Sequence, residues 1–303
     1  MRSDIVVVGS LNADLVTRLD RFPSPGETVA ALDFAVHPGG KGANQAYAAA
    51  RLGGKVSMVG CIGRDPYGEL LAQSLSDVGV NVSGVTREAE APTGMALIAL
   101  DASGENQIVF VAGANARLDP ERLAASEARL AAAAVVLLQL EVPLATVAAA
   151  ARIARAGGAT VILDPSPAQP LPRELLSCVD YLTPNQSELQ NLTRRAVGRQ
   201  DDQAARDLTS GIGLKVIVKM GDAGALLVDG DRQSFWPAVR VAAVDATGAG
   251  DAFNAALAVA LSEGRSLEEA GRWAVAAGAL CVSRAGAQPS MPTRQEVEKT
   301  LGR

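Results

Sequence analysis

Aromatic side chains and long apolar runs are both scarce in this chain of 303 residues. Aromatic residues make up only 3% of the chain and apolar residues 48%, so a buried core must be built mainly from Ala, Val and Leu. No apolar run approaches the roughly 18 residues that a membrane helix requires. The start, MRSDIVVVGS, lacks the layout of a signal peptide. We therefore expect a soluble, cytoplasmic protein with no membrane partner.

Cysteine, histidine and clustered basic residues are also scarce. Cys61, Cys178 and Cys281 are isolated and odd in number, which predicts reduced thiols rather than a disulfide framework. The single histidine, His37, gives little support to a Ser-His-Asp hydrolase or a histidine-rich zinc site. The net charge is −5 and there is no basic run. Nucleic-acid partners need clustered Lys and Arg, so we expect none.

Two common nucleotide-binding motifs are missing. The P-loop pattern G-x-x-x-x-G-K-[ST] is absent, because Lys41 is followed by Gly and Lys55 by Val. The segment GSLNAD at 9–14, which follows the first expected strand, does not contain the G-x-G-x-x-G of a dinucleotide site. A nicotinamide-dependent oxidoreductase is therefore disfavoured.

Strand-like and helix-like segments alternate along the chain. Continuous apolar runs predict buried strands, and the Ala/Leu-rich stretches between them predict helices. This alternation is typical of an α/β fold with a doubly wound, mostly parallel sheet covered by helices on both faces. The expected strands are 5–8, 56–59, 135–140, 160–163, 181–183 and 216–219, the expected helices include 42–52 and 144–156, and the chain from about residue 249 onward is mostly helical.

Two segments interrupt this alternation, at about 15–38 and 82–112. They carry short alternating strands, at 28–36 and 82–111, and turn signals such as Asp101-Ala102-Ser103-Gly104. They predict a small antiparallel sheet inserted into a single α/β domain that spans 1–303. Such a lid can cover a ligand and exclude water. An ordinary edge hairpin explains the same pattern equally well.

The strongest local motif is DATGAGD at 245–251, followed by a helical run at 252–261. Small residues let the backbone approach a ligand, and a helix start offers unpaired N–H donors and a positive dipole end. These donors can stabilise charge on a transferring phosphoryl group, while Asp251 takes a proton from an attacking hydroxyl. A simple helix cap is the alternative role of Asp251. Capping, however, needs only one of the two acids that frame the motif.

Polar residues at expected strand ends are candidate ligands for a hydroxylated acceptor. Asn12 and Asp14 follow the first strand, Glu141 ends the strand at 135–140, and GGKGAN at 39–44 opens a helix. Ligands of open α/β sheets lie outside the carboxyl ends of the strands. These side chains are therefore suited to a polyol. A loop that caps itself and a solvated strand-end acid remain the alternatives.

Asn185 and Glu188 lie three residues apart at an expected helix start. Asn at the N-cap with Glu at N3 forms a capping box, and that geometry alone explains both residues. A functional role would place Glu188 near magnesium or its waters, because hard cations bind oxygen ligands.

Several short motifs occur in a defined order, and together they resemble those of the ribokinase family of carbohydrate kinases (the PfkB-type sugar kinases). The motifs are NAD at 12–14, GGKGANQ at 39–45, PTG at 92–94, GAN at 113–115, QLE at 139–141, DATGAGD at 245–251 and GAQPS at 286–290. The resemblance implies a doubly wound α/β domain with a small β-sheet lid, paired in a homodimer through lid strands. It also implies transfer of the γ-phosphoryl group of ATP to the 5-hydroxyl of ribose.

The resemblance further assigns residues to three groups. The sugar would be held by Asn12, Asp14, Gly39, Gly40, Lys41, Asn44 and Glu141, with Asp251 as the general base. ATP and Mg²⁺ would be held by Asn185, Glu188, Lys219, Gly221 and Gly224, with the N–H groups of Gly248, Ala249 and Gly250 as the anion hole. A K⁺ ion near that hole would involve Asp245, Thr247, Cys281, Arg284, Gly286 and Ser290, several of them through backbone carbonyls.

Some choices stay open after the resemblance. Lys219 stands where these kinases often carry Thr, and it would add a charge near the nucleotide phosphates. The acceptor is ribose or, as alternatives, a nucleoside, deoxyribose or fructose. A non-catalytic sugar sensor on the same fold is the alternative from another class, although both Asp251 and the glycines of the anion hole are present.

Overall fold

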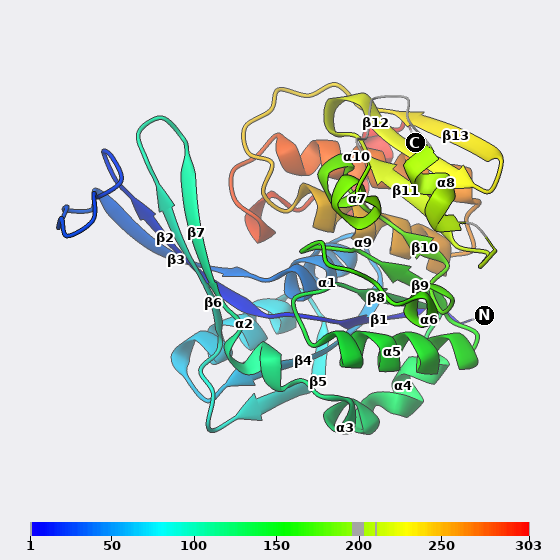
Figure 1. Ribbon diagram of the computed structural model, residues 1–303, viewed down its shortest axis with the longest axis horizontal. Helices are drawn as coiled ribbons and strands as arrows, with labels where there is room; N and C mark the ends of the chain where they lie inside the picture. Colours follow the sequence, from blue (N-terminus) through cyan, green and yellow to red (C-terminus); the bar gives the residue numbers. More distant parts are fainter. Residues whose placement is uncertain (1, 196–202, 210, 303) are drawn as a thin grey trace.

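The computed structural model describes residues 2–195, 203–209 and 211–302. Its main feature is a nine-stranded sheet, which Figure 1 shows in the middle of the molecule. The seven strands from β11 to β5 are parallel, whereas β12 runs antiparallel to both β11 and β13 at one edge. In spatial order the strands are β13 (Arg232–Pro237), β12 (Gly224–Asp229), β11 (Lys215–Lys219), β10 (Tyr181–Leu182), β9 (Thr160–Leu163), β8 (Val135–Leu138), β1 (Asp4–Val8), β4 (Lys55–Gly63) and β5 (Asn81–Glu88).

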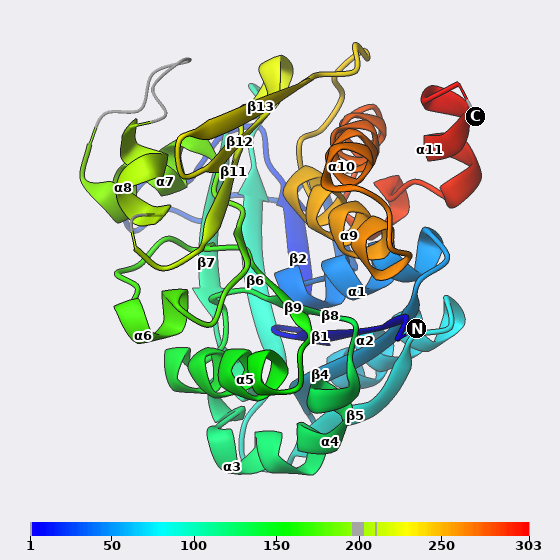
Figure 2. The same cartoon turned by 90° about the vertical axis from the view of Figure 1, so that its right-hand side faces the viewer.

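Helices cover both faces of this sheet, as the side view in Figure 2 shows. The helices are α1 (Lys41–Arg51), α2 (Pro66–Asp77), α3 (Pro120–Leu123), α4 (Glu127–Ala132), α5 (Leu144–Ala156), α6 (Arg173–Leu176), α7 (Gln186–Thr193), α8 (Gln203–Thr209), α9 (Ala249–Ser262), α10 (Leu267–Val282) and α11 (Arg294–Thr300). No helix within the described ranges is long and apolar enough to cross a membrane.

The interior strand β1 shows why the chain forms two cores. Successive side chains of a strand point to opposite faces. Ile5 and Val7 accordingly pack in the core with α1, α9 and α10, whereas Val6 and Val8 pack in the other core with α4 and α5. A strand buried on both faces must be apolar at every position, and the run IVVV meets this requirement. The predicted α/β fold with a mostly parallel sheet is confirmed.

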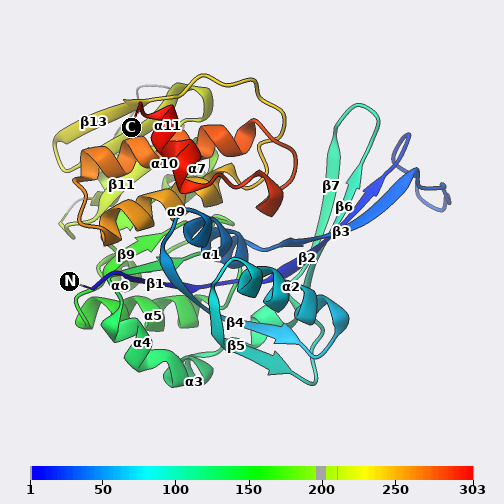
Figure 3. The same cartoon turned by 180° about the vertical axis from the view of Figure 1, so that it is seen from behind.

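The segments expected to form a lid contribute to a second, four-stranded sheet, called the lid sheet below. Its order is β3 (Asp33–Gly39), β2 (Asn12–Arg18), β6 (Gly94–Leu100) and β7 (Asn106–Val111). Figures 1 and 3 show these strands projecting from one side of the body. The chain enters the lid only three residues after β1 ends, so the lid begins directly at the carboxyl end of the main sheet.

The structure corrects four details of the predicted lid. The stretch 81–88 is strand β5, which pairs with β4 in the main sheet, so the lid segment expected at 82–112 begins too early. The other lid segment begins at Asn12 rather than 15, and within it 28–32 is irregular rather than strand. The expected antiparallel arrangement holds for β3–β2 and β6–β7, but β2 and β6 are parallel.

Candidate active site

The predicted anion loop lies at the start of α9. Gly248 is the N-cap residue with φ of +80°, a left-handed conformation that favours glycine, and a Cβ there would lie 2.9 Å from Cε of Met291. Of the three N–H groups expected to form an anion hole, that of Ala249 donates to the carbonyl oxygen of Ala246 at 3.2 Å. Gly248 and Gly250 line the adjoining pocket, and Ala249 does not.

Asp251 lies in the first turn of α9 and is 6% exposed. Its Oδ2 accepts a hydrogen bond of 3.1 Å from Nδ2 of Asn44, and its Oδ1 accepts one of 3.1 Å from Nε2 of Gln45. Burial raises the pKa of the Asp251 carboxyl to about 6, and the nearby charge of Asp164 adds to this, while Lys41 and the two amides oppose it. A carboxylate with a pKa near 6 is ionised at neutral pH and is basic enough to accept a proton.

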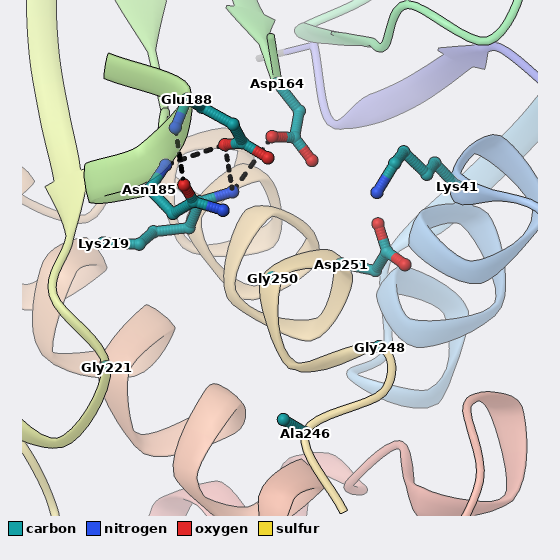
Figure 4. Close-up of a pocket in the computed structure, with 10 residues that line it drawn as sticks. All are labelled: Lys41, Asp164, Asn185, Glu188, Lys219, Gly221, Ala246, Gly248, Gly250 and Asp251. Carbon is teal, nitrogen blue, oxygen red and sulfur yellow. Dashed lines mark hydrogen bonds and ion pairs between the residues drawn. The ribbon is translucent and has the colours of Figure 1, made fainter. Parts of the chain in front are cut away.

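A pocket of about 290 Å³ opens beside Asp251 (Figure 4). Five different parts of the fold supply polar side chains or glycines to it, which explains why their sequence positions are far apart. The lining residues are Lys41, Asp164, Asn185, Glu188, Lys219, Gly221, Ala246, Gly248, Gly250 and Asp251.

The expected sugar ligands gather where β1, β2 and α1 meet. Oε2 of Glu141 accepts hydrogen bonds from Nδ2 of Asn12 at 3.3 Å and from the backbone N–H of Lys41 at 3.2 Å. Asn12 is itself fixed, because its Oδ1 accepts a 2.7 Å hydrogen bond from Nδ2 of Asn115. Gly40 has φ of +87°, and a Cβ on it would lie 2.6 Å from the backbone nitrogen of Asn12. The motif at 39–45 and the motif at 12–14 therefore form one surface.

Asp14 completes this surface. Its carboxylate lies over Gly39, where a Cβ would come within 2.1 Å of Oδ2 of Asp14. Burial raises the pKa of the Asp14 carboxyl to about 7, and the charges of Glu141 and Asp251 contribute to the shift. Lys41 balances these acids: its own burial lowers its pKa, but Asp251, Asp164, Glu141 and Glu188 outweigh that effect and raise it.

The expected nucleotide residues lie on the other side of Asp251. Asn185 and Glu188 form the predicted capping box at the start of α7, with reciprocal hydrogen bonds of 2.7 and 2.8 Å. Both also line the pocket, so the capping geometry does not remove Glu188 from it. Gly221 lines the pocket as well. Gly224 does not line the pocket. Packing explains why glycine occupies this position, because a Cβ there would lie 2.0 Å from the carbonyl oxygen of Trp236.

The expected K⁺ residues converge behind the anion loop. Oδ1 of Asp245 accepts hydrogen bonds from the backbone and hydroxyl of Thr247, and Oδ2 accepts one from the backbone of Gly286 at 2.8 Å. Sγ of Cys281 lies 2.9 Å from Oγ of Ser290 and donates to the carbonyl oxygen of Thr247 at 3.5 Å. These hydrogen bonds hold Asp245, Thr247 and Gly286, and Cys281, Thr247 and Ser290, together at one junction.

Arg284 is the exception in the K⁺ group. Its guanidinium forms an ion pair with Glu296 at the start of α11, so only the backbone of Arg284 is available to the junction.

Three residues without an assigned role lie beside Asp251 and its pocket. Asp164, directly after β9, lines the pocket, and its Oδ1 lies 2.9 Å from Nζ of Lys219. Gln45 and Gln139 are fully buried and hydrogen-bonded to each other beside it. Asp164 follows a predicted strand end, so the strand-end rule that singled out Asn12 and Glu141 applies to it equally.

The comparisons with known proteins agree with this geometry. The family model described as pfkB family carbohydrate kinase matches residues 2–294. The chain belongs to the pfkB family. A relative of this family, the ribokinase of Haemophilus influenzae, is 41% identical over 305 residues, which cover 99% of this chain and 99% of the relative.

Other members of the pfkB family cover the chain as completely. The solved structure of Arabidopsis thaliana ribokinase complexed with ribose and ATP is 40% identical, covers 99% of each chain and has a TM-score of 0.94. The deoxyribokinase of Salmonella typhi is 36% identical over 98% of each chain. The chain is therefore a carbohydrate kinase with the fold of this family.

Proposed function

We propose that the protein transfers the γ-phosphoryl group of ATP to the 5-hydroxyl of D-ribose, with Asp251 as the general base. The observation that carries this proposal is the position of Asp251. Its buried carboxylate lies at the start of α9, between the sugar-ligand surface formed by 12–14, 39–45 and Glu141 and the pocket lined by Glu188 and Lys219. The full-length similarity to ribokinases, one of them complexed with ribose and ATP, supports ribose and ATP as the two ligands.

The chain's own groups divide the work in this proposal. Asn12, Asp14 and Glu141 hold ribose hydroxyls, and Asn44 does so from α1. Asp251 accepts the proton of the 5-hydroxyl. The oxygen of that hydroxyl then bonds to the γ-phosphorus, while the bond between this phosphorus and the oxygen of ADP breaks. The N–H groups of Gly248 and Gly250 and the ammonium of Lys41 stabilise negative charge on the transferring group. Positioning and electrostatics supply most of the effect.

Two metal ions belong to the proposal. Asn185 and Glu188 would hold Mg²⁺ or its waters, and the ion would neutralise charge on the nucleotide phosphates. Among the described residues no group of three or more His, Cys, Asp or Glu side chains forms a metal cluster. Mg²⁺ keeps several waters and uses one or two carboxylates together with substrate phosphates. K⁺ would bind the junction of Asp245, Thr247, Cys281, Gly286 and Ser290 and would fix the loop without contacting substrate.

The proposal also includes a homodimer and a cytoplasmic setting. Large apolar side chains are exposed on the lid, which supports pairing of two lids. They are Leu32, Phe34, Leu97, Ile108, Val109, Phe110 and Val111. We expect sedimentation velocity to give a dimer and Phe110→Glu to shift it towards monomer; a monomeric wild type would contradict the pairing. The free thiols of Cys61, Cys178 and Cys281 are consistent with a reducing compartment.

A panel of acceptors tests the choice of substrate. We expect kcat/KM to be highest for D-ribose when ribose, 2-deoxyribose, fructose and adenosine are compared with ATP as donor. Deoxyribose is the second candidate, because a deoxyribokinase is among the relatives. A higher kcat/KM for any other acceptor would replace ribose, and sugar binding without turnover of any acceptor would support the non-catalytic sensor.

A further inference from the structure

Gln45 joins the two buried carboxylates of the site. It lies in α1 and is 0% exposed. Its Nε2 lies 3.1 Å from Oδ1 of Asp251 and 3.1 Å from Oδ2 of Asp164, so its two amide hydrogens reach both acids. The ionised carboxylates can only accept, which means that the nitrogen of Gln45, and not its oxygen, must face them.

Gln139 fixes that orientation from behind. With the nitrogen of Gln45 turned to the acids, its Oε1 points away from them and accepts a 2.6 Å hydrogen bond from Nε2 of Gln139. Gln139 is also 0% exposed, and its side chain lies against the backbone of Gly9, where a Cβ would come within 1.9 Å of its Oε1. The missing side chain of Gly9 therefore makes room for Gln139.

We propose that Gln45, oriented by Gln139, is a positioning residue for Asp251. The proposal rests on the proposed role of Asp251 as general base and adds to it a reason for the orientation of the carboxylate. Two consecutive residues of α1 hold the carboxylate of Asp251. Asn44 donates a hydrogen bond to its Oδ2, and Gln45 donates one to its Oδ1. The plane of the carboxylate is thus fixed at both oxygens before any ligand binds.

The same contact ties the base to the nucleotide side of the pocket. Asp164 accepts from Gln45 through Oδ2 and binds Lys219 through Oδ1. A change at Gln45 therefore alters the orientation of both acids. The other titratable or charged groups that face Asp251 are Lys41 on α1, Asp14 on β2, Asp164 after β9 and Cys281 on α10.

Gln45→Met tests the proposal, because it keeps the length of the side chain and removes both donors. The measurement is the single-turnover rate of phosphoryl transfer from pH 5 to 9, with ribose and ATP saturating so that titration of Asp14 does not enter through sugar binding. Hydrogen bonds to the ionised form lower a pKa, so their loss raises it. We expect the acidic limb of the profile to move up by about one pH unit. Because the pKa of Asp251 is about 6, the rate should fall roughly tenfold at pH 5 but only about twofold at pH 7, with KM for ribose unchanged.

Two further variants separate positioning from general damage. Gln139→Met leaves the donors of Gln45 in place but removes the group that orients them, and we expect a smaller shift in the same direction. Gln73→Met is the matched control: Gln73 is exposed on α2 and donates to the carboxylate of Asp77 at 2.6 Å, away from the site. Its pH profile should coincide with that of the wild type.

The pH profiles of these variants separate a failure of the positioning role of Gln45 from a failure of Asp251 as the base. A rate lowered by the same factor at every pH, or an acidic limb that stays in place in both Gln45→Met and Gln139→Met, would overturn the proposal. If Gln45→Met does not fold, the limb of Gln139→Met decides the question alone. Asp251→Asn, measured in parallel, tests the general base itself: near-normal rates in that variant would remove the proposed function, whatever Gln45 does.

Discussion

The ammonium group of Lys219 lies 2.9 Å from Oδ1 of Asp164 and 4.0 Å from Oε2 of Glu188 (Figure 4). It also lies against Gly250, where a Cβ would be 3.3 Å away. The side chain of Lys219 is thus in the part of the pocket that adjoins the anion loop, and its charge balances two acids before any phosphate enters.

Lys219→Met removes this charge while keeping the aliphatic stem. Charge-assisted hydrogen bonds to phosphate are worth about 1.5–3 kcal/mol, so we expect KM for ATP to rise roughly tenfold or more, with KM for ribose unaffected. Lys215→Met is the control: Lys215 is on the same strand and pairs with Asp229 at 2.8 Å outside the pocket. Equal KM values for ATP in wild type and Lys219→Met would exclude a phosphate contact by Lys219.

Asp251→Asn keeps the shape of the side chain and removes its basicity. General-base assistance is typically worth roughly 10²–10⁴-fold, so we expect kcat to fall by about that factor. Ribose binding, measured by calorimetry, should change little, because the sugar ligands on β2 and α1 stay in place. A variant that binds ribose normally and turns over at a near-normal rate would exclude Asp251 as the base.

The cation junction predicts a salt-specific rate. At constant ionic strength we expect kcat/KM to rise several-fold when sodium is replaced by potassium. Asp245→Ala should lose this difference, because Asp245 connects Thr247 to Gly286 across the junction. Identical rates in the two salts would show that the junction does not bind K⁺ during turnover.

Asp14→Asn should stabilise the protein at alkaline pH. The raised pKa means that the folded protein holds a proton on Asp14 up to about pH 7, while the unfolded chain releases it near 3.8. The unfolded state therefore binds fewer protons between these values, and stability falls as pH rises through this window. Once Asp14 is ionised the cost is up to about 4 kcal/mol.

The measurement is the free energy of unfolding by urea at several pH values. The advantage of Asp14→Asn over the wild type should grow from about pH 4 to pH 7 and then stay level. The matched control is Asp20→Asn, at an exposed aspartate just after β2, for which we expect little change. An advantage that does not vary with pH would mean that ionisation of Asp14 is not its cause.

Local patterns account for most of what the sequence predicted. The helix expected at 144–156 is α5 with the same bounds, because it is rich in alanine, a strong helix former, and no Gly or Pro interrupts it. The strand at 5–8 was recognisable because a doubly buried strand is apolar throughout. The grouping of the lid strands was not, since pairing of β2 with β6 joins residues about 80 positions apart and has no local signature.

The site shows the same division. Asp251 and the glycines before it were predictable, because one contiguous motif places them at a helix start. The contact between Gln45 and Asp251 spans 206 residues, and that between Gln45 and Asp164 spans 119. Asp164 follows a predicted strand end, as Asn12 does, but no motif in the sequence marks it as part of the site. Its importance arises only when the sheet brings the end of β9 beside α1 and α9.

Strand β2 is the second strand of the lid sheet, and it also contains Asn12 and Asp14. In the proposed function Asn12 and Asp14 contact the acceptor, so a chimaera that received β2 from a related kinase should take on part of that kinase's acceptor selectivity. Exchange of the β6–β7 hairpin alone would change the expected cover over the ligand and leave Asn12 and Asp14 in place. The two exchanges therefore test acceptor selectivity and protection from hydrolysis separately.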